Sequence, residues 1–119
     1  MGFDERQAVE AAVLDYFEGW FDGDAGRMER ALHPDLAKRA LEKDERGLDE
    51  TTAQWMIDAT ARGVGRASDP GERGIEVRVD DVHGSIANAT VRSAVYREYV
   101  QLARTSEGWK IVNTLWAPA

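Results

Sequence analysis

Tyr16 and His33 are the side chains of this sequence with the chemistry most useful to a catalyst. A buried tyrosine hydroxyl can donate to an oxygen on which negative charge develops. A histidine, with an unperturbed pKa near 6.5, can act as a general base. Tyr16 could equally be a core aromatic with one hydrogen bond. His33 could equally close a helix beside Pro34 and bond a backbone carbonyl. Both are therefore candidate catalytic residues, and the residues leave open whether the protein is an enzyme.

Lys38 and Arg39 are neighbouring cations that follow the His33-Pro34 turn. On a strand they would point to opposite faces, so one of them could enter a pocket mouth. A guanidinium binds a carboxylate through two parallel hydrogen bonds, which makes Arg39 the preferred anion-binding candidate. The alternative is a solvated charged edge.

The sequence predicts no metal and no cofactor. It has no cysteine, and His33 and His83 are too far apart for a ligand pair at helix or finger spacing. There is no phosphate-binding loop of the Gly-Lys-Ser or Gly-Lys-Thr type. Gly63 and Gly65 follow a predicted helix instead of opening one, so they are no dinucleotide-binding fingerprint.

Aromatic side chains are the larger signal, because small-molecule pockets are mostly apolar and aromatic with a few placed polar groups. Asn113 is added because a polar residue between Ile111 and Leu115 needs a hydrogen-bond partner. A core or a dimer interface filled with aromatics is the alternative. The residues predicted to bind a small apolar or aromatic molecule are Tyr16, Trp20, Arg39, Trp55, Tyr99, Asn113 and Trp116.

The N-terminal half predicts three helices. Apolar residues recur at three- and four-residue spacing over 4–22, with Asp4 as the cap and Gly23 at the end. Asp24 caps a short second helix that Pro34 stops. Residues 36–42 form a short strand or an irregular extension.

A loop over 44–50 then leads to a third predicted helix, roughly 50–62, which Asp49 caps. Residues 63–74, with four glycines, form a mobile loop or a lid.

The C-terminal half predicts strands. Alternation over 75–82 is broken at Asp81, as a bulge would break it. Further strands are expected over 86–96, about 97–104 and 109–116. Helices followed by a meander of strands predict an α+β fold, with three N-terminal helices packed on a curved antiparallel sheet in one domain, 1–119.

Composition disfavours several partners. The chain has 119 residues, a net charge of −7 and a pI of about 4.8. Nucleic acids and acidic membranes attract basic surfaces, so neither is an expected partner. The N-terminus lacks a secretory signal and no apolar stretch approaches ~20 residues, so a cytoplasmic protein is expected.

A homodimer is also expected, because both faces of the predicted sheet are partly apolar. One face would pack on the helices and the other on a partner. The residues concerned are Ala87, Ala89, Val91 and Val95 on one face, and Ile86, Ala94 and Tyr96 on the other.

The order of Gly23-Asp24, His33-Pro34-Asp35 and the closing stretch 107–113 resembles the nuclear transport factor 2-like (NTF2-like) superfamily, which includes SnoaL-like and ketosteroid-isomerase-like proteins. Residues 33–39 are most similar to its lumazine-binding group of small bacterial proteins. The resemblance covers nearly the whole chain. It implies a cone-shaped fold, a sheet wrapped round a pocket and dimers through the sheet.

The resemblance also tests the catalytic candidates. Tyr16 lies where ketosteroid isomerases carry the tyrosine that donates to the oxyanion. Their carboxylate base would fall, without gaps, at Ala40, which cannot take a proton. A gap could bring Glu42 or Asp44 nearer.

Three hypotheses follow. The first is a small-molecule-binding protein whose ligand is unassigned. The second is a cofactor-free isomerase, cyclase or dehydratase that uses Tyr16 and His33. The third is a dimeric assembly or accessory protein without a ligand.

Overall fold

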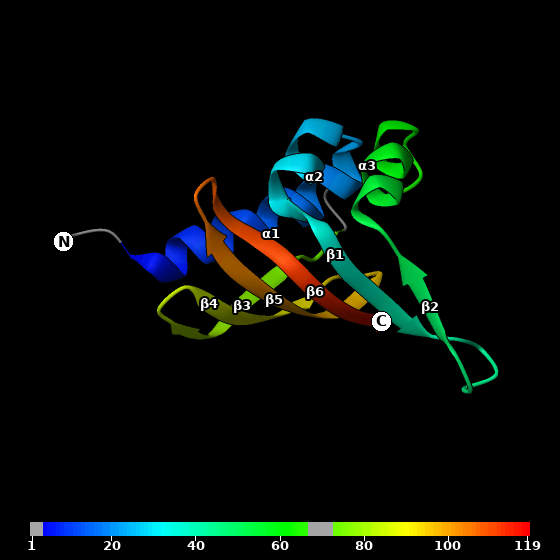
Figure 1. Ribbon diagram of the computed structural model, residues 1–119. Coiled ribbons are helices and arrows are strands. Elements are labelled where there is room, and N and C mark those ends of the chain that lie inside the picture. Colours follow the sequence, from blue (N-terminus) through cyan, green and yellow to red (C-terminus); the bar gives the residue numbers. More distant parts are fainter. Residues whose placement is uncertain (1–3, 67–72) are drawn as a thin grey trace.

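The computed structural model describes residues 4–66 and 73–119 (Figure 1). Part of the segment predicted to be a lid or mobile loop, residues 67–72, lies outside the described residues. The elements are, in chain order, α1 (Glu5–Asp22), α2 (Ala25–Ala31), β1 (Leu32–Leu41), β2 (Leu48–Thr51), α3 (Ala53–Ala61), β3 (Glu76–His83), β4 (Ile86–Arg92), β5 (Tyr96–Thr105) and β6 (Gly108–Pro118).

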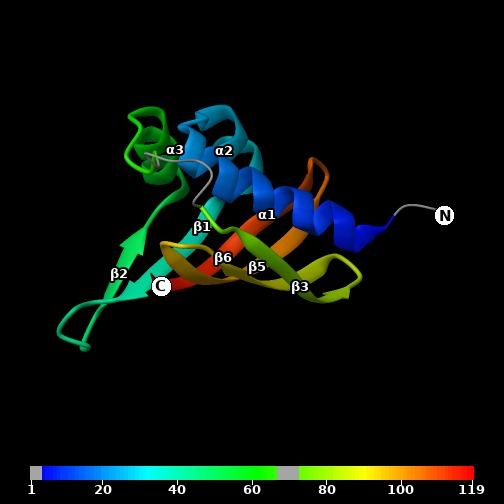
Figure 2. The ribbon, with the colours of Figure 1, turned by 180° about the vertical axis from the view of Figure 1, so that it is seen from behind.

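In the described parts of the chain the strands form one six-stranded sheet with the order β2-β1-β6-β5-β4-β3. Neighbouring strands are antiparallel except β1 and β6, which are parallel. The predicted antiparallel sheet is therefore wrong at this pair. Parallel pairing needs a long connection, and α3 and the meander β3 to β5 provide it. The β1–β2 hairpin projects beyond the helices (Figure 2).

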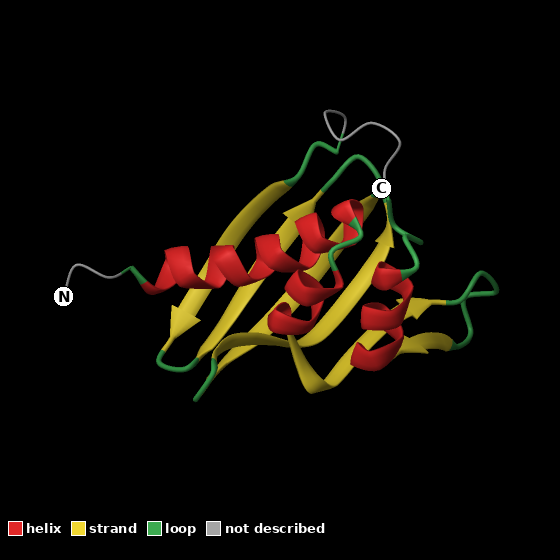
Figure 3. Ribbon diagram, turned by 90° about the horizontal axis from the view of Figure 1, so that it is seen from above, coloured by secondary structure: helices red, strands yellow, loops and turns green. Residues whose placement is uncertain are grey.

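Helices α1, α2 and α3 lie on one face of the sheet (Figure 3). Asp4 caps α1 by accepting a hydrogen bond from the backbone N–H of Arg6 at 2.9 Å. Gly23, at φ 70°, ends it in the left-handed conformation that glycine adopts without steric cost. The predicted helix 4–22 and both of its end signals are confirmed. The apolar face of α1 packs on the sheet and includes the fully buried Val9 and Val13.

The chain around Pro34 departs from the prediction. Asp24 caps α2 as expected, accepting from the N–H of Arg27 at 3.1 Å. The helix ends at Ala31, however, and Pro34 lies within β1, where the pairing with β6 is irregular between Leu32 and Ala37. Proline lacks the N–H that a regular ladder needs, so it is accommodated at such an irregularity. The segment 36–42, predicted as a short strand or an extension, belongs to this ten-residue strand.

The start of α3 is also corrected. Asp49 pairs with Ala40 in the β1–β2 ladder and does not cap a helix. Thr52 is the cap, and its hydroxyl accepts from the N–H of Trp55 at 3.1 Å. Aspartate and threonine both cap helices well, so the pairing of Asp49 in the β1–β2 hairpin leaves Thr52 as the cap.

Two features of the strands set which side chains face the helices. The bulge predicted at Asp81 is confirmed by a register shift between Val79 and Asp81. A second shift lies in the β5–β6 ladder, opposite Gln101 and Leu102. A bulge moves later side chains of a strand to the other face. Trp109 and Ile111, and after the bulge Thr114, are therefore buried beneath the helices.

The strand predicted over 86–96 ends earlier, at Arg92. The Ser93 hydroxyl accepts the N–H groups of Val95 and Tyr96 at 3.2 and 2.9 Å and forms a turn. Tyr96 therefore starts β5 and faces the helices together with Ala87 and Ala89, although they were predicted on opposite faces, while Val95 is exposed in the turn. None of the described helices is long and apolar enough to cross a membrane.

Candidate functional site

A cavity of about 170 Å³ lies between the helices and the inner face of the sheet. Its volume is comparable to that of an apolar cavity of ~150 Å³ that accepts benzene. Aromatic side chains supply most of its wall. The lining residues are Tyr16, Phe17, Trp20, Lys38, Thr51, Trp55, Met56, Val64, Tyr96, Glu98 and Trp116.

Three polar side chains meet on the cavity wall. The Tyr16 hydroxyl, on α1, donates a hydrogen bond to Glu98 Oε2 on β5 at 2.7 Å. Lys38 Nζ, on β1, donates to the Tyr16 hydroxyl and lies 3.4 Å from the same Glu98 oxygen. Tyr16 and Glu98 are 2% exposed and Lys38 is 7% exposed. We call these residues the Tyr16–Lys38–Glu98 cluster.

Tyr16 is held protonated by its surroundings. Burial raises the pKa of its hydroxyl well above the usual value, and the Glu98 carboxylate raises it further through its charge and the hydrogen bond. The phenol therefore stays a donor throughout the physiological pH range.

Lys38 experiences two opposing effects. Burial lowers the pKa of its ammonium group, because the charged form loses its hydration. The Glu98 carboxylate opposes this shift, but the net pKa is lowered. Lys38 therefore gives up its proton more readily than a lysine in water.

Aromatic rings hold the cluster from two sides. Lys38 Nζ lies 4.9 Å from the centroid of the Tyr16 ring and 5.4 Å from that of Trp116. Trp116 packs edge-on against Tyr96, with centroids 5.6 Å apart, and Trp20 Nε1 donates to the Tyr96 hydroxyl at 3.3 Å. Aromatic packing and one hydrogen bond thus connect the side chains of the cavity wall.

The cavity opens to solvent beside α3. Trp55 and Val64 line it and are 49% and 57% exposed. The polar cluster is buried, so the cavity runs from an apolar mouth to a polar inner wall.

Four predicted binding residues lie at this cavity, namely Tyr16, Trp20, Trp55 and Trp116. They come from α1, α3 and β6, so the fold assembles them from distant parts of the chain. Their contribution to ligand binding stays a prediction.

The other three predicted binding residues do not line the cavity. Arg39 points away from Lys38 and pairs with Glu50 at 2.9 Å, in a cross-strand ion pair. Tyr99 is 51% exposed, on the face opposite to Glu98. Asn113 donates to the Gln101 side chain at 3.3 Å, because the β6 bulge moves it to the outer face with Leu115 and away from the face of Ile111. The structure therefore places none of these three at the cavity wall.

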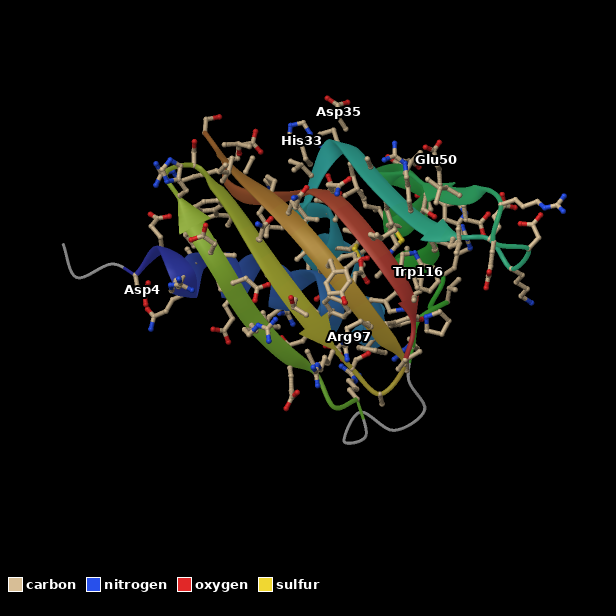
Figure 4. All side chains as sticks on the ribbon, turned by 90° about the horizontal axis from the view of Figure 1, so that it is seen from below. Asp4, His33, Asp35, Glu50, Arg97 and Trp116 are labelled. Atoms are coloured by element: carbon tan, nitrogen blue, oxygen red, sulfur yellow. The ribbon has the colours of Figure 1, made fainter. Side chains whose placement is uncertain are left out.

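His33 also lies away from the cavity, at the start of β1. Its Nδ1 accepts the backbone N–H of Asp35 at 3.0 Å, and among the described residues no hydrogen bond from His33 to a backbone carbonyl is seen. Figure 4 shows His33 and Asp35 together at one end of the sheet, apart from Trp116. The geometry gives His33 no place at the cavity wall.

Lys38 and Glu98 are the charged cavity residues outside the predicted binding set, although Lys38 is one of the two neighbouring cations that could enter a pocket mouth. Lys38 lies two residues from Leu36 and from Ala40, and Glu98 two residues from Val100. Alternation therefore puts both charges on apolar, inward faces. Because residues 36–42 could form a short strand or an irregular extension, this alternation is established for Lys38 only by the structure.

The structure also shows where the residues considered for a carboxylate base lie. Ala40 pairs with Trp116 in the β1–β6 ladder and is not among the residues that line the cavity. Glu42 and Asp44 are exposed in the β1–β2 turn. The carboxylate at the cavity comes from another strand, as Glu98. Within the described residues, no group of three or more His, Asp or Glu side chains is placed to hold a metal ion.

Solved structures share this architecture. An "NTF-2 like protein of unknown function" from Silicibacter pomeroyi is 15% identical, with a TM-score of 0.77, over 97% of this chain and 96% of its own. An NTF2-like protein of unknown function from Shewanella baltica is 17% identical, with a TM-score of 0.79, over 97% and 94%. A "putative ketosteroid isomerase" from Shewanella frigidimarina is 14% identical, with a TM-score of 0.61, over 92% and 94%. At these identities the likeness defines the fold, which is NTF2-like.

The family follows from the sequence itself. Residues 4–117 match the sequence model of the family described as "Putative lumazine-binding", and the chain belongs to that family. No curated protein matches the chain. The resemblance to the NTF2-like superfamily, and to its lumazine-binding group, is confirmed.

Proposed function

We propose that this protein binds a small, flat, largely apolar molecule that carries an oxygen acceptor. The observation that carries the proposal is the pairing of an aromatic cavity with the Tyr16–Lys38–Glu98 cluster on its wall. Rings of the ligand would pack between Trp20 and Trp116, and its oxygen would accept from Lys38. Buried donors of this kind orient a ligand, and apolar walls supply most of its affinity.

The family description suggests the first probe. Lumazine has two fused flat rings with carbonyl oxygens, which suits aromatic packing and a single ammonium donor. Three of the four tryptophans, Trp20, Trp55 and Trp116, line the cavity. Titration of the protein with lumazine should therefore quench tryptophan fluorescence and raise the melting temperature.

Two matched variants test whether the ligand binds in this cavity. Trp20→Ala removes a wall and should weaken binding by at least about tenfold, since the loss of an aromatic contact costs more than ~1.4 kcal/mol. Ile86→Ala, at a 60% exposed position of β4, serves as the control and should bind like the wild type. Equal binding by Trp20→Ala and the wild type would place the ligand elsewhere.

A second candidate function is proton transfer next to a carbonyl group, as in an isomerase or dehydratase. It is favoured by Glu98, a carboxylate that lies at the cavity although the position of Ala40 lacks one. Among the described residues, hydrogen bonds to Glu98 reach only Oε2, so the other oxygen could take a proton from a ligand. Tyr16 and Lys38 would then stabilise the enolate oxygen.

Hydrogen–deuterium exchange tests this candidate. The α-protons of β-tetralone, followed by NMR in heavy water, should exchange faster with protein than with buffer. Glu98→Gln should abolish the acceleration, because an amide takes no proton, and Tyr16→Phe should lower it about 10²-fold or more, as the loss of an oxyanion donor does. Acceleration that survives Tyr16→Phe would remove Tyr16 from the mechanism.

A further inference from the structure

The surroundings of Lys38 differ from those of the other two lysines. The chain has Lys38, Lys43 and Lys110. Lys43 is exposed in the β1–β2 turn, and Lys110 donates to the backbone carbonyl of Arg30 at 2.6 Å on the surface. Lys38 alone of the three is buried at a cavity that a small molecule could enter.

The position of the Lys38 nitrogen suits a nucleophile. It lies beside two aromatic rings, and among the described residues the carboxylate paired with it is Glu98, whose Oε2 is 3.4 Å away. Holding a separated ion pair in an apolar site costs desolvation energy for both ions. When Glu98 accepts the Lys38 proton in the reaction, both charges disappear and a lone pair is left on nitrogen.

We propose that Lys38 is a nucleophilic amine that captures a small aromatic aldehyde or ketone in the cavity as an imine. This inference rests on the proposed function, because the carbonyl compound must first occupy the cavity. The lowered pKa of Lys38 supports it, since a desolvated lysine in an apolar pocket is a known type of activated amine.

The steps balance without a further reactant. The nitrogen lone pair forms a bond to the carbonyl carbon, and the carbonyl π electrons move to oxygen, which takes the proton held by Glu98. The nitrogen, now positively charged, returns one proton to the Glu98 carboxylate. That proton goes to the hydroxyl group as the C–O bond breaks and water leaves. The nitrogen and carbon are then joined as an iminium ion, which keeps one proton on nitrogen, and Glu98 ends as the carboxylate that balances its charge.

Reductive trapping tests the proposal. Wild-type protein is incubated with benzaldehyde and sodium cyanoborohydride at pH 7.4, and the labelled site is found by peptide mass spectrometry. An ordinary lysine is only ~0.1% unprotonated at this pH. We expect one benzyl group on Lys38, formed at least about tenfold faster than on Lys43, the exposed lysine that represents this ordinary behaviour.

The comparison within one molecule does not depend on a variant that folds. Label on Lys43, Lys110 or the terminal amine with Lys38 unmodified, or no label at all, would overturn the proposal. Lys38→Arg should lose the fast label and Lys43→Arg should keep it. Circular dichroism checks that both variants fold.

Benzyl alcohol separates this proposal from the proposed function. It has the same ring without the carbonyl, so it should quench tryptophan fluorescence and slow the labelling of Lys38 by competition. Quenching by both compounds with no adduct on Lys38 would leave the binding function intact and overturn imine formation. Absence of quenching by either compound would count against both proposals for this class of ligand.

Discussion

The hydroxyl of Tyr16 on α1 donates to the carboxylate of Glu98 on β5 across 82 residues of chain, at 2.7 Å. Lys38, from β1, contacts both. One buried cluster therefore connects the longest helix to two strands that are not neighbours in the sheet. Each of the three polar groups is a hydrogen-bond partner of the other two, so removal of one leaves the remaining two with fewer partners.

Glu98→Leu should be strongly destabilising. It removes the only carboxylate that compensates the buried Lys38 ammonium within the described residues, and breaking a buried pair typically costs about 3–5 kcal/mol. Urea unfolding would measure the loss in the free energy of unfolding.

The double variant Lys38→Met, Glu98→Leu is the matched control for that change. Both charges are gone, so most of the lost stability should return. A double variant as unstable as Glu98→Leu alone would show that the leucine fits poorly, and that the uncompensated charge is not the cause.

Stability at alkaline pH should depend on Tyr16. Its pKa is raised in the folded state above the usual value near 10, so the folded protein keeps a proton that the unfolded chain loses. This contribution is fully present below about pH 10 and is lost as the pH rises through the folded pKa, by up to ~1.4 kcal/mol per pH unit. The free energy of unfolding should therefore fall above pH 10.

Tyr16→Phe removes this titration, so its stability should fall less steeply in the same range. Urea unfolding at several pH values from 9 to 11 would compare the slopes. Equal slopes for the two proteins would mean that Tyr16 ionises in the folded state as readily as in the unfolded chain.

Gly65 should be sensitive to substitution because it packs directly against the Trp20 indole. A Cβ atom at this position would overlap ring atoms of Trp20, which forms a wall of the cavity. Gly65→Ala should push the indole out of place, weaken ligand binding at least about tenfold and destabilise the protein by about 1–3 kcal/mol. Fluorescence titration and thermal unfolding would measure both effects.

Gly26→Ala is the corresponding control, within α2. Its Cβ would meet only a side-chain oxygen of Asp24 at ordinary contact distance, and alanine is the better helix former. This variant should bind normally and be at least as stable as the wild type. Normal binding by Gly65→Ala as well would indicate that Trp20 can move without loss of the site.

The outer face of the sheet is the surface on which we propose that two copies associate. None of the described helices lies in front of this face (Figure 4). Tyr99 and Leu115 are direct partners in the β5–β6 ladder and are 51% and 49% exposed, so they form an apolar pair there. Light scattering at micromolar concentration should give the mass of a dimer.

Substitution of Tyr99 by lysine should shift that equilibrium to the monomer, because a dimer would bring two like charges together. Val64→Lys, at an exposed position beside the cavity mouth, adds the same charge elsewhere and should leave the dimer intact. A monomeric wild type would remove the proposed interface.

Local signals in the sequence were sufficient for much of the fold. The apolar spacing of residues 4–22 predicted α1, and with it the inward positions of Tyr16 and Trp20. Asp4 and Asp24 marked helix starts, and Asp81 marked a bulge. Each of these signals depends on residues a few positions apart, so no distant partner has to be known.

The cluster at the cavity was decided only by the tertiary structure. Whether a lysine or a glutamate in a strand is solvated or buried depends on the partner it meets, and Lys38 and Glu98 are 60 residues apart. The parallel pairing of β1 with β6 and the bulge in β6 set which strand faces meet the helices. Alternation gives each strand two faces, but the packing of distant elements selects the one that is buried.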